Sequence, residues 1–312
     1  MKLTFNNTLF KPDTTVIVGL SGGSDSVALL HYLARQQKKL GIKVIAAHLD
    51  HEWRKESQRD VLFCQKFCEY LEVSFKSQKA SSLKFTPRND GSKESTARQQ
   101  RRFFLEKLAD QFKAESIVLA HHKQDQLETF FIRLIRGATI SGLGGMKEQN
   151  GRYVRPLLNT DKAEIQEYLD QNLLSYLQDP SNDSDAFLRN RIRKHLLPVL
   201  QECDKRGPEQ IIRSTQTLQN TEQFLQELTT ETYQQVFVKN SLDLRKFIVL
   251  DPFLQRRIVS LWLCKEAPQF TLTEKFIAEI IRFLHQPTGA THQLGPNWAI
   301  TKKQKKALLK RI

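Results

Sequence analysis

Short apolar runs alternate with amphipathic stretches over the first half of the chain. The patterns typical of buried strands lie at 16–20, 43–50, 73–75 and 115–120. The patterns typical of helices follow these runs at 27–33, 56–71, 94–112 and 125–136. Strands that alternate with helices of this length predict an α/β fold with a doubly wound parallel sheet. Ligands bind such sheets outside the carboxyl ends of the strands.

Beyond Arg152 the pattern changes and becomes mainly helical. A short extended piece is followed by helical patterns, which lie at 162–172, 188–200 and, as three helices, 209–284. The sequence Arg206-Gly207-Pro208 is a strong helix breaker. We therefore expect an α/β domain over residues 1–207 and a smaller, mainly helical domain over residues 208–312. The chain closes with a lysine-rich tail, for which a nucleic-acid contact and a solvated end are both open.

The charge of the chain indicates a polyanionic partner. The 312 residues carry a formal net charge of +14, although hydrophobic (39%) and charged (26%) fractions are ordinary. Such an excess favours nucleic acid or an anionic membrane face. No apolar stretch approaches the ~18 residues of a membrane span, and the first residues lack the apolar core of a signal peptide. We therefore expect a nucleic-acid partner, no membrane association and a cytoplasmic protein.

The cysteines do not indicate a metal site. There are four, at positions 64, 68, 203 and 264, with no CxxC pair and no accompanying histidine cluster. Zinc is therefore not expected. Buried free thiols in a reducing compartment are the favoured interpretation.

The hexapeptide Ser21-Gly22-Gly23-Ser24-Asp25-Ser26 lies between an apolar strand and a helix start. Its glycines allow a tight turn, and the helix that follows points N–H groups and its positive dipole end at an anion. The serine hydroxyls add donors, and Asp25 can hold a divalent cation beside phosphates. No lysine occurs between residues 16 and 35, so the loop is not the GxxxxGK[ST] type. A serine-rich turn with an ordinary helix cap is the alternative.

A second stretch, residues 121–129 (HHKQDQLET), places two carboxylates at the start of a helix. Asp125 and Glu128 are three residues apart and therefore share a face. Such a pair can bind a metal or an ammonium group, or accept a proton. The alternative is a solvated acidic first turn, which stabilises a helix in any case.

Further motifs lie in a fixed order along the chain. They are ARQQR at 97–101, LIRGA at 134–138, GLGGM at 142–146, RPLL at 155–158 and QDPSNDSDAFLRNRIR at 178–193. Together with SGGSDS and HHKQDQLET they closely resemble the tRNA(Ile)-lysidine synthetases, bacterial ATP pyrophosphatases that act on tRNA. The resemblance covers about residues 16–198 and is most specific over 178–193. Gln124 replaces an acidic residue of that family, and Glu52 replaces a glycine.

This resemblance implies a fold and a reaction. The fold is that of the adenine nucleotide α-hydrolases. The family uses ATP, with Mg²⁺, to join free L-lysine to the wobble cytidine of the isoleucine tRNA that has the anticodon CAU. The cytidine O2 attacks the α-phosphate and pyrophosphate leaves; the lysine ε-amine then attacks C2 and AMP leaves. Lysine's amine has a pKa near 10.4, so a carboxylate must hold the ammonium and take or relay its proton.

The resemblance also implies roles for particular residues. The catalytic residues would be Asp25, Asp125 and Glu128, with Asp25 as the metal ligand. The nucleotide would contact Ser21, Gly22, Gly23, Ser24, Asp25, Ser26, His48, Arg98, Arg101 and His121. The tRNA backbone would contact Arg136, Arg189, Arg191, Arg193 and Lys194. The domain at 208–312 would recognise the tRNA at a greater distance.

Two other functions are open. A tRNA thiolase of the same superfamily would need a reactive cysteine pair beside the loop, and the cysteines here lie in segments away from the motifs. A non-catalytic RNA-binding protein with a vestigial nucleotide site would be expected to have lost Asp25 or the glycines, and both are present. The oligomeric state stays open, a homodimer included.

Overall fold

The chain forms two compact units, Met1–Leu218 and Gln219–Ile312. The computed structural model describes residues 3–53, 56–86, 93–178, 185, 187–266, 270–287 and 291–312, without the side chain of Glu94. Along the chain the division falls after Leu218, inside the helix α9 (Gly207–Val236), whose first residue is the predicted domain boundary. The division of labour between the two domains stays a prediction. No helix in the described ranges is long and apolar enough to cross a membrane.

The first unit is built on a six-stranded sheet with the order β3-β2-β1-β4-β6-β5. The strands are β1 (Thr14–Gly19), β2 (Ile42–Asp50), β3 (Ser74–Lys79), β4 (Ser116–Val118), β5 (Gln149–Asn150) and β6 (Tyr153–Val154). All neighbouring strands are parallel except β5, which is antiparallel to β6. The predicted doubly wound sheet is therefore confirmed. Its strand order reverses at β1, between β2 and β4, and this reversal is where such sheets bind ligands.

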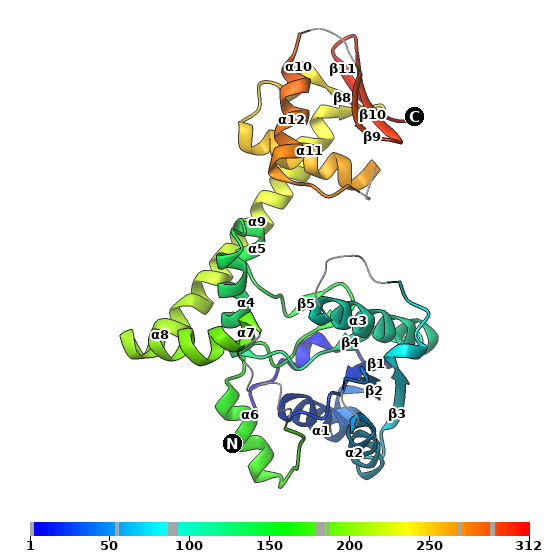
Figure 1. The fold of residues 1–312 in the computed structure, drawn as a ribbon, viewed down its shortest axis with the longest axis vertical. Coiled ribbons are helices and arrows are strands. Elements are labelled where there is room, and N and C mark those ends of the chain that lie inside the picture. Colours follow the sequence, from blue (N-terminus) through cyan, green and yellow to red (C-terminus); the bar gives the residue numbers. More distant parts are fainter. Residues whose placement is uncertain are drawn as a thin grey trace. The chain divides into compact units, whose positions relative to one another are not determined.

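Helices cover both faces of this sheet, which explains why its strands read as continuous apolar runs. On one face, Val16 and Val18 of β1 join the core formed with α1 (Ser24–Leu40), α2 (Ser57–Tyr70) and α6 (Lys162–Gln171). On the other face, Ile17 joins the core formed with α3 (Lys93–Gln111). Figure 1 shows α1 and α2 on one side of β1 and β2, and α3 on the other side.

The other helices of the first unit carry the second set of motifs. They are α4 (Lys123–Ile135), α5 (Ile140–Leu143), α7 (Leu188–Arg191), the π-helical turn η4 (Ile192–Leu196) and α8 (Leu197–Cys203), with 3₁₀ turns η1 (Asn7–Leu9) and η2 (Ala80–Ser82). The helix predicted at 188–200 thus contains a π-helical turn. Leu127 of α4, Ile192 and Leu197 form a small buried cluster, which fixes α4 against this turn.

The second unit packs helices against a five-stranded antiparallel sheet. Its helices after α9 are α10 (Leu244–Phe247), α11 (Pro252–Glu266) and α12 (Glu274–His285). Its sheet, in the order β7-β8-β11-β10-β9, consists of β7 (Phe237–Val238), β8 (Ser241–Asp243), β9 (Thr291–Gly295), β10 (Trp298–Lys303) and β11 (Lys306–Arg311). The helical character was predicted but the sheet was not. The lysine-rich tail is the hairpin of β10 and β11, in which Ile300 and Ala307 are fully buried.

Candidate functional site

The glycine loop lies at the carboxyl end of β1, where the strand order reverses. Serine hydroxyls hold its shape. The Ser21 N–H donates to Ser26 Oγ at 3.1 Å, and Ser26 Oγ donates to the Gly23 carbonyl at 2.9 Å. Gly23 is the N-cap of α1 and has no side chain to cap the helix. The first turn of α1 therefore presents backbone N–H groups and a positive dipole end, as an anion site requires.

Gly22 is a glycine because neither its backbone nor its surroundings admit a side chain. Its φ is +86°, and a Cβ there would lie 2.6 Å from Leu177 Cδ1. The Gly22 carbonyl accepts a hydrogen bond from the Leu177 N–H at 2.9 Å, so the segment before the DPSN motif closes over the loop.

The expectation that the cysteines lie away from the motifs is wrong for Cys64. Its Sγ would lie 3.4 Å from a Gly22 Cβ, and it lies 3.5 Å from His48 Nδ1. This position could not be predicted because α2, which carries Cys64, reaches the loop only through the fold. Burial raises the pKa of the Cys64 thiol well above its usual range, so the sulfur is not a nucleophilic thiolate.

Asp25 meets two basic side chains from outside the loop, Lys162 and His122. Lys162 Nζ lies 2.5 Å from Asp25 Oδ1 and donates to Ser24 Oγ at 2.8 Å. His122 Nε2 lies 3.6 Å from Asp25 Oδ2. Burial raises the pKa of Asp25, but His122 and Lys162 outweigh this effect and lower it to about 2. The carboxylate is therefore ionised at any physiological pH.

His122 joins the carboxylates that follow two neighbouring strands. It is the N-cap of α4. Its ring Nδ1 accepts a hydrogen bond from the backbone N–H of Gln124 at 3.3 Å, and its backbone N–H donates to Asp125 Oδ2 at 3.0 Å. Its Nε2 also lies 3.5 Å from Asp125 Oδ2. Burial lowers the pKa of His122, but Asp25 and Asp125 raise it further, so the net direction is upward. An imidazole with a raised pKa thus links the loop to α4.

Sequence reasoning missed both His122 and Lys162 as site residues. His122 belongs to the HHKQDQLET motif and is adjacent to the predicted His121. The sequence gives a weak indication of a role for Lys162, because this lysine is the first residue of α6, where the helix dipole disfavours a positive charge.

Glu128 lies deeper than an open binding carboxylate would. Its side chain is 0% exposed; Arg193 Nε donates to its Oε1 at 2.6 Å, and Arg189 Nε lies 3.2 Å from its Oε2. Burial raises the pKa of Glu128, and the Arg193 hydrogen bond only partly offsets that rise. Two arginines expected to contact tRNA therefore converge on a carboxylate expected to bind lysine. Those roles stay predictions, and the ion pairs are a structural role that the sequence did not reveal.

The remaining predicted nucleotide residues include histidines that are not cationic. His48 is buried, its Nδ1 lies 2.9 Å from the Leu20 carbonyl, and burial lowers its pKa. Burial also lowers the pKa of His121 to about 4, and its buried Nδ1 has no protein partner among the described residues. The charge of Arg98 contributes to the lowered pKa of His121, and that of Arg101 to the lowered pKa of His48. Their contacts with a nucleotide stay predictions.

The other predicted tRNA-binding residues are exposed. Arg136 is the C-cap of α4, Arg191 ends α7, and Lys194 Nζ lies 3.5 Å from Asp185. Most of the DPSN motif, at 179–184 with residue 186, lies outside the described residues.

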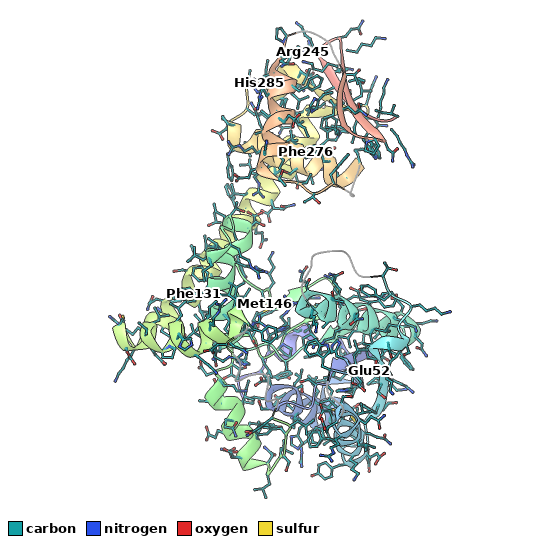
Figure 2. The ribbon with its side chains drawn as sticks, in the orientation of Figure 1. Glu52, Phe131, Met146, Arg245, Phe276 and His285 are labelled. Carbon is teal, nitrogen blue, oxygen red and sulfur yellow. The ribbon has the colours of Figure 1, made fainter. Side chains whose placement is uncertain are left out.

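The GLGGM motif covers the end of α5 and the loop that follows it, and α4 holds both in place. The side-chain amide of Gln126 pairs with both backbone groups of Met146 at 2.7 Å each (Met146 is labelled in Figure 2). Arg133 Nη1 donates to the carbonyls of Gly142 at 2.6 Å and Gly145 at 3.0 Å. These residues therefore have a structural explanation that requires no ligand.

The donor set fits a divalent metal only with help from a ligand. Within the described ranges, no group of three or more His, Cys, Asp or Glu residues could hold a metal ion. Asp25 is ionised and lies within the loop, and Mg²⁺ is commonly held by one or two carboxylates together with substrate phosphates. Asp25 therefore fits Mg²⁺ that arrives with a nucleotide.

Comparison with known proteins gives two kinds of relative. The PP-loop domain family matches residues 1–200. A tRNA(Ile)-lysidine synthase from Bacillus cereus is 33% identical over 297 residues, which is 90% of this chain and 62% of that protein. One from Francisella tularensis subsp. novicida is 33% identical over 277 residues, 88% of this chain and 67% of that protein. The chain thus spans somewhat under two thirds of the length of the Bacillus relatives.

A solved structure with the same fold is the U34-tRNA thiolase NcsA from Methanococcus maripaludis with its [4Fe-4S] cluster. Its TM-score is 0.59 at 19% identity, with 69% of this chain and 74% of that chain covered. At this identity the likeness supports the fold alone.

Proposed function

The chain belongs to the tRNA(Ile)-lysidine synthase family of PP-loop proteins, and from this premise we propose that it makes lysidine in tRNA. In this reaction ATP drives the joining of free L-lysine to C2 of the wobble cytidine in the CAU-anticodon isoleucine tRNA. One observation carries the proposal. The SGGSDS loop after β1 and the carboxylate-bearing start of α4 after β4 converge at the reversal point of the sheet, where His122 joins them.

The first half-reaction is adenylation of the cytidine. The base must leave its stack so that O2 reaches the α-phosphate. O2 then forms a bond to phosphorus, and the bond to the leaving pyrophosphate breaks. The N–H groups in the first turn of α1 stabilise the charge that develops on the phosphates. Asp25 would hold Mg²⁺, which supplies further neutralisation of that charge when bound.

The second half-reaction forms the carbon–nitrogen bond. The ε-amine of lysine attacks C2, and the adenylate oxygen leaves with AMP. The amine must first lose a proton, which a carboxylate can hold or relay. We assign ammonium binding to Asp125. Its carboxylate lies 3.5 Å from His122 Nε2, and the same nitrogen lies 3.6 Å from Asp25 in the loop. Glu128 remains a second candidate, and in the present conformation it holds Arg189 and Arg193 behind Asp125.

The tRNA supplies the polyanion that the charge of +14 calls for. Arg136, Arg191 and Lys194 are exposed residues that could follow its backbone, and the arginine pair on Glu128 lies at the same end of α4 as Asp125. Such an enzyme acts in the cytoplasm, where tRNA and free lysine are found. A homodimer is compatible with the proposal but is not required by it.

The thiolase alternative is weaker at this site. Cys64 lies beside the loop, but burial raises its thiol pKa, and burial also raises that of Cys68 to about 12. Cys203 and Cys264 are exposed on α8 and α11. A persulfide-forming or cluster-binding pair at the loop therefore has no support among the described residues.

The test is pyrophosphate release from ATP by the purified protein. Release should require both lysine and the CAU-anticodon tRNA, and a tRNA with uridine at the wobble position should not support it. The modified nucleoside should gain one lysine by mass spectrometry. Release that ignores lysine but responds to a sulfur donor would favour the thiolase. Binding of tRNA without any release would favour the non-catalytic protein.

A further inference from the structure

The position of Lys162 is unfavourable for a positive charge. It is the first residue of α6, where the helix dipole disfavours a positive charge. Its ammonium lies 2.5 Å from Asp25 and 2.8 Å from the Ser24 hydroxyl, so it sits on the loop at the start of α1. The side chain is 39% exposed, which leaves it free to change rotamer.

The loop itself lacks the lysine on which other phosphate loops depend. Residues 21–26 contain three serines, two glycines and one aspartate. A triphosphate that enters this loop meets the ionised carboxylate of Asp25 and no cationic side chain of the loop's own. The nearest lysine ammonium recorded on the loop belongs to a helix more than 130 residues away in the chain.

We propose that Lys162 is the phosphate-binding lysine of this site, supplied by α6, and that Asp25 holds it until metal-bound ATP enters. The inference rests on the proposed use of ATP at the loop. When a divalent cation takes the Asp25 carboxylate, Lys162 is released from it. The ammonium then needs only a side-chain rotation to reach the phosphate oxygens at the first turn of α1. His122 remains beside Asp25, so the carboxylate keeps a second partner during this exchange.

The backbone that carries Lys162 is fixed independently of its side chain. Asp161 and Glu164 form a capping box at the start of α6, and Ile165 and Leu169 are fully buried in the sheet's helical layer. The side chains of Lys162 and Asp25 are 39% and 31% exposed, so their ion pair should contribute no more than about 1 kcal/mol to stability. Loss of the lysine should therefore change ligand binding and leave the fold intact.

The experiment compares a non-cleavable ATP analogue, α,β-methylene-ATP, with AMP by titration calorimetry in Mg²⁺. Lys162→Met should weaken binding of the analogue about 10- to 100-fold, as expected for one charge-assisted hydrogen bond, and should change AMP binding by less than about 2-fold. Lys162→Arg keeps the charge and should bind the analogue more tightly than Lys162→Met. The matched control is Lys123→Met at the start of α4, where the lysine pairs with Asp161 and Glu209. It should bind both ligands as the wild type does.

Each result decides between distinct claims. Equal weakening of the analogue and AMP, or no weakening of either, would overturn the role of Lys162. In EDTA, where Lys162 stays on Asp25, the wild type and Lys162→Met should differ far less. An equal loss in EDTA and Mg²⁺ would overturn the exchange from carboxylate to phosphate. If the wild type binds neither ligand, the proposed ATP-dependent function fails, whatever the variants do.

Discussion

Replacing Arg193 by methionine should expose the cost of the buried carboxylate on α4. Glu128 is fully buried. In the described part of the chain, the one hydrogen bond recorded to its side chain is the one that Arg193 donates. Methionine keeps much of the volume of arginine but leaves the charge without that donor. Arg189 stays 3.2 Å away, so some compensation remains.

The magnitude follows from the burial of each partner. Breaking a fully buried ion pair costs about 3–5 kcal/mol, but the Arg193 side chain is 35% exposed and Arg189 persists, so we expect about 2–3 kcal/mol. Glu128→Gln should cost less, about 1–2 kcal/mol, because both arginines can turn toward water. The double variant should cost less than the sum of the single ones. Arg191→Met, at the exposed end of α7, is the control and should cost under about 0.5 kcal/mol.

The cost should depend on pH in one direction. Burial raises the folded-state pKa of Glu128 above its unfolded value, and removal of Arg193 raises it further. A carboxyl group whose pKa is raised in the folded state contributes stability at pH values below its unfolded pKa, near 4.3. That contribution is lost as the pH rises through the folded-state pKa. The penalty of Arg193→Met should therefore be smallest near the unfolded pKa and should grow as the pH rises above it. Glu128→Gln removes the titrating group, so its penalty should vary less.

Urea unfolding at pH 5 and pH 8, with hydrogen exchange of the α4 peptide (Lys123–Ile135), measures both quantities. Hydrogen exchange assigns the loss to the first unit, which matters because the two units need not unfold together. If Arg193→Met costs no more than Arg191→Met at pH 8, the ion pair is not a buried one in solution. A penalty that grows toward acid pH would show that the direction of the Glu128 pKa is wrong.

Two further predictions concern backbone geometry. Gly22→Ala should destabilise the first unit, because φ is +86° and the new Cβ would lie 2.6 Å from Leu177 Cδ1, whereas Gly23→Ala should leave its stability nearly unchanged at the extended φ of −73°; equal free energies of unfolding of the two variants in urea would contradict this. Gln126→Leu should destabilise the GLGGM loop by about 1–3 kcal/mol, because both backbone groups of Met146 lose their partner; unchanged hydrogen exchange at 142–146 would count against it.

The sequence predicted the parts of this protein that depend on neighbours in the chain. An apolar run, two glycines and a helical pattern define the turn at 21–26 whatever lies around it. The alternation of strands and helices likewise implies that chain segments after β1 and β4 end at one edge of the sheet. The position of Asp25 and Asp125 could therefore be predicted before any contact was known.

The partners of those residues depend on distant segments, and local patterns carry little information about them. Lys162 lies 137 positions from Asp25, and Arg193 lies 65 from Glu128. The antiparallel sheet of the second unit was missed for a related reason. Strands β10 and β11 do not show a clean alternation of apolar and polar residues, because Lys302 lies opposite Ala307 on the face that carries Ile300, and buried Ala299 lies opposite Lys310 on the other face.

The carboxylates of this site differ in what a ligand must displace. A carboxylate that is withdrawn from water needs a partner, and the fold gives Lys162 to the half-buried Asp25 and Arg193 to the fully buried Glu128. The binding free energy of an incoming cation at either position is only the difference between the energy of the contacts that it makes and the energy of those that it breaks. Asp125, within the described part of the chain, pairs with the imidazole of His122 instead. We therefore expect a substrate ammonium to bind Asp125, at the lowest cost in broken ion pairs, and a divalent cation to be favoured at Asp25, where its greater charge can displace a lysine.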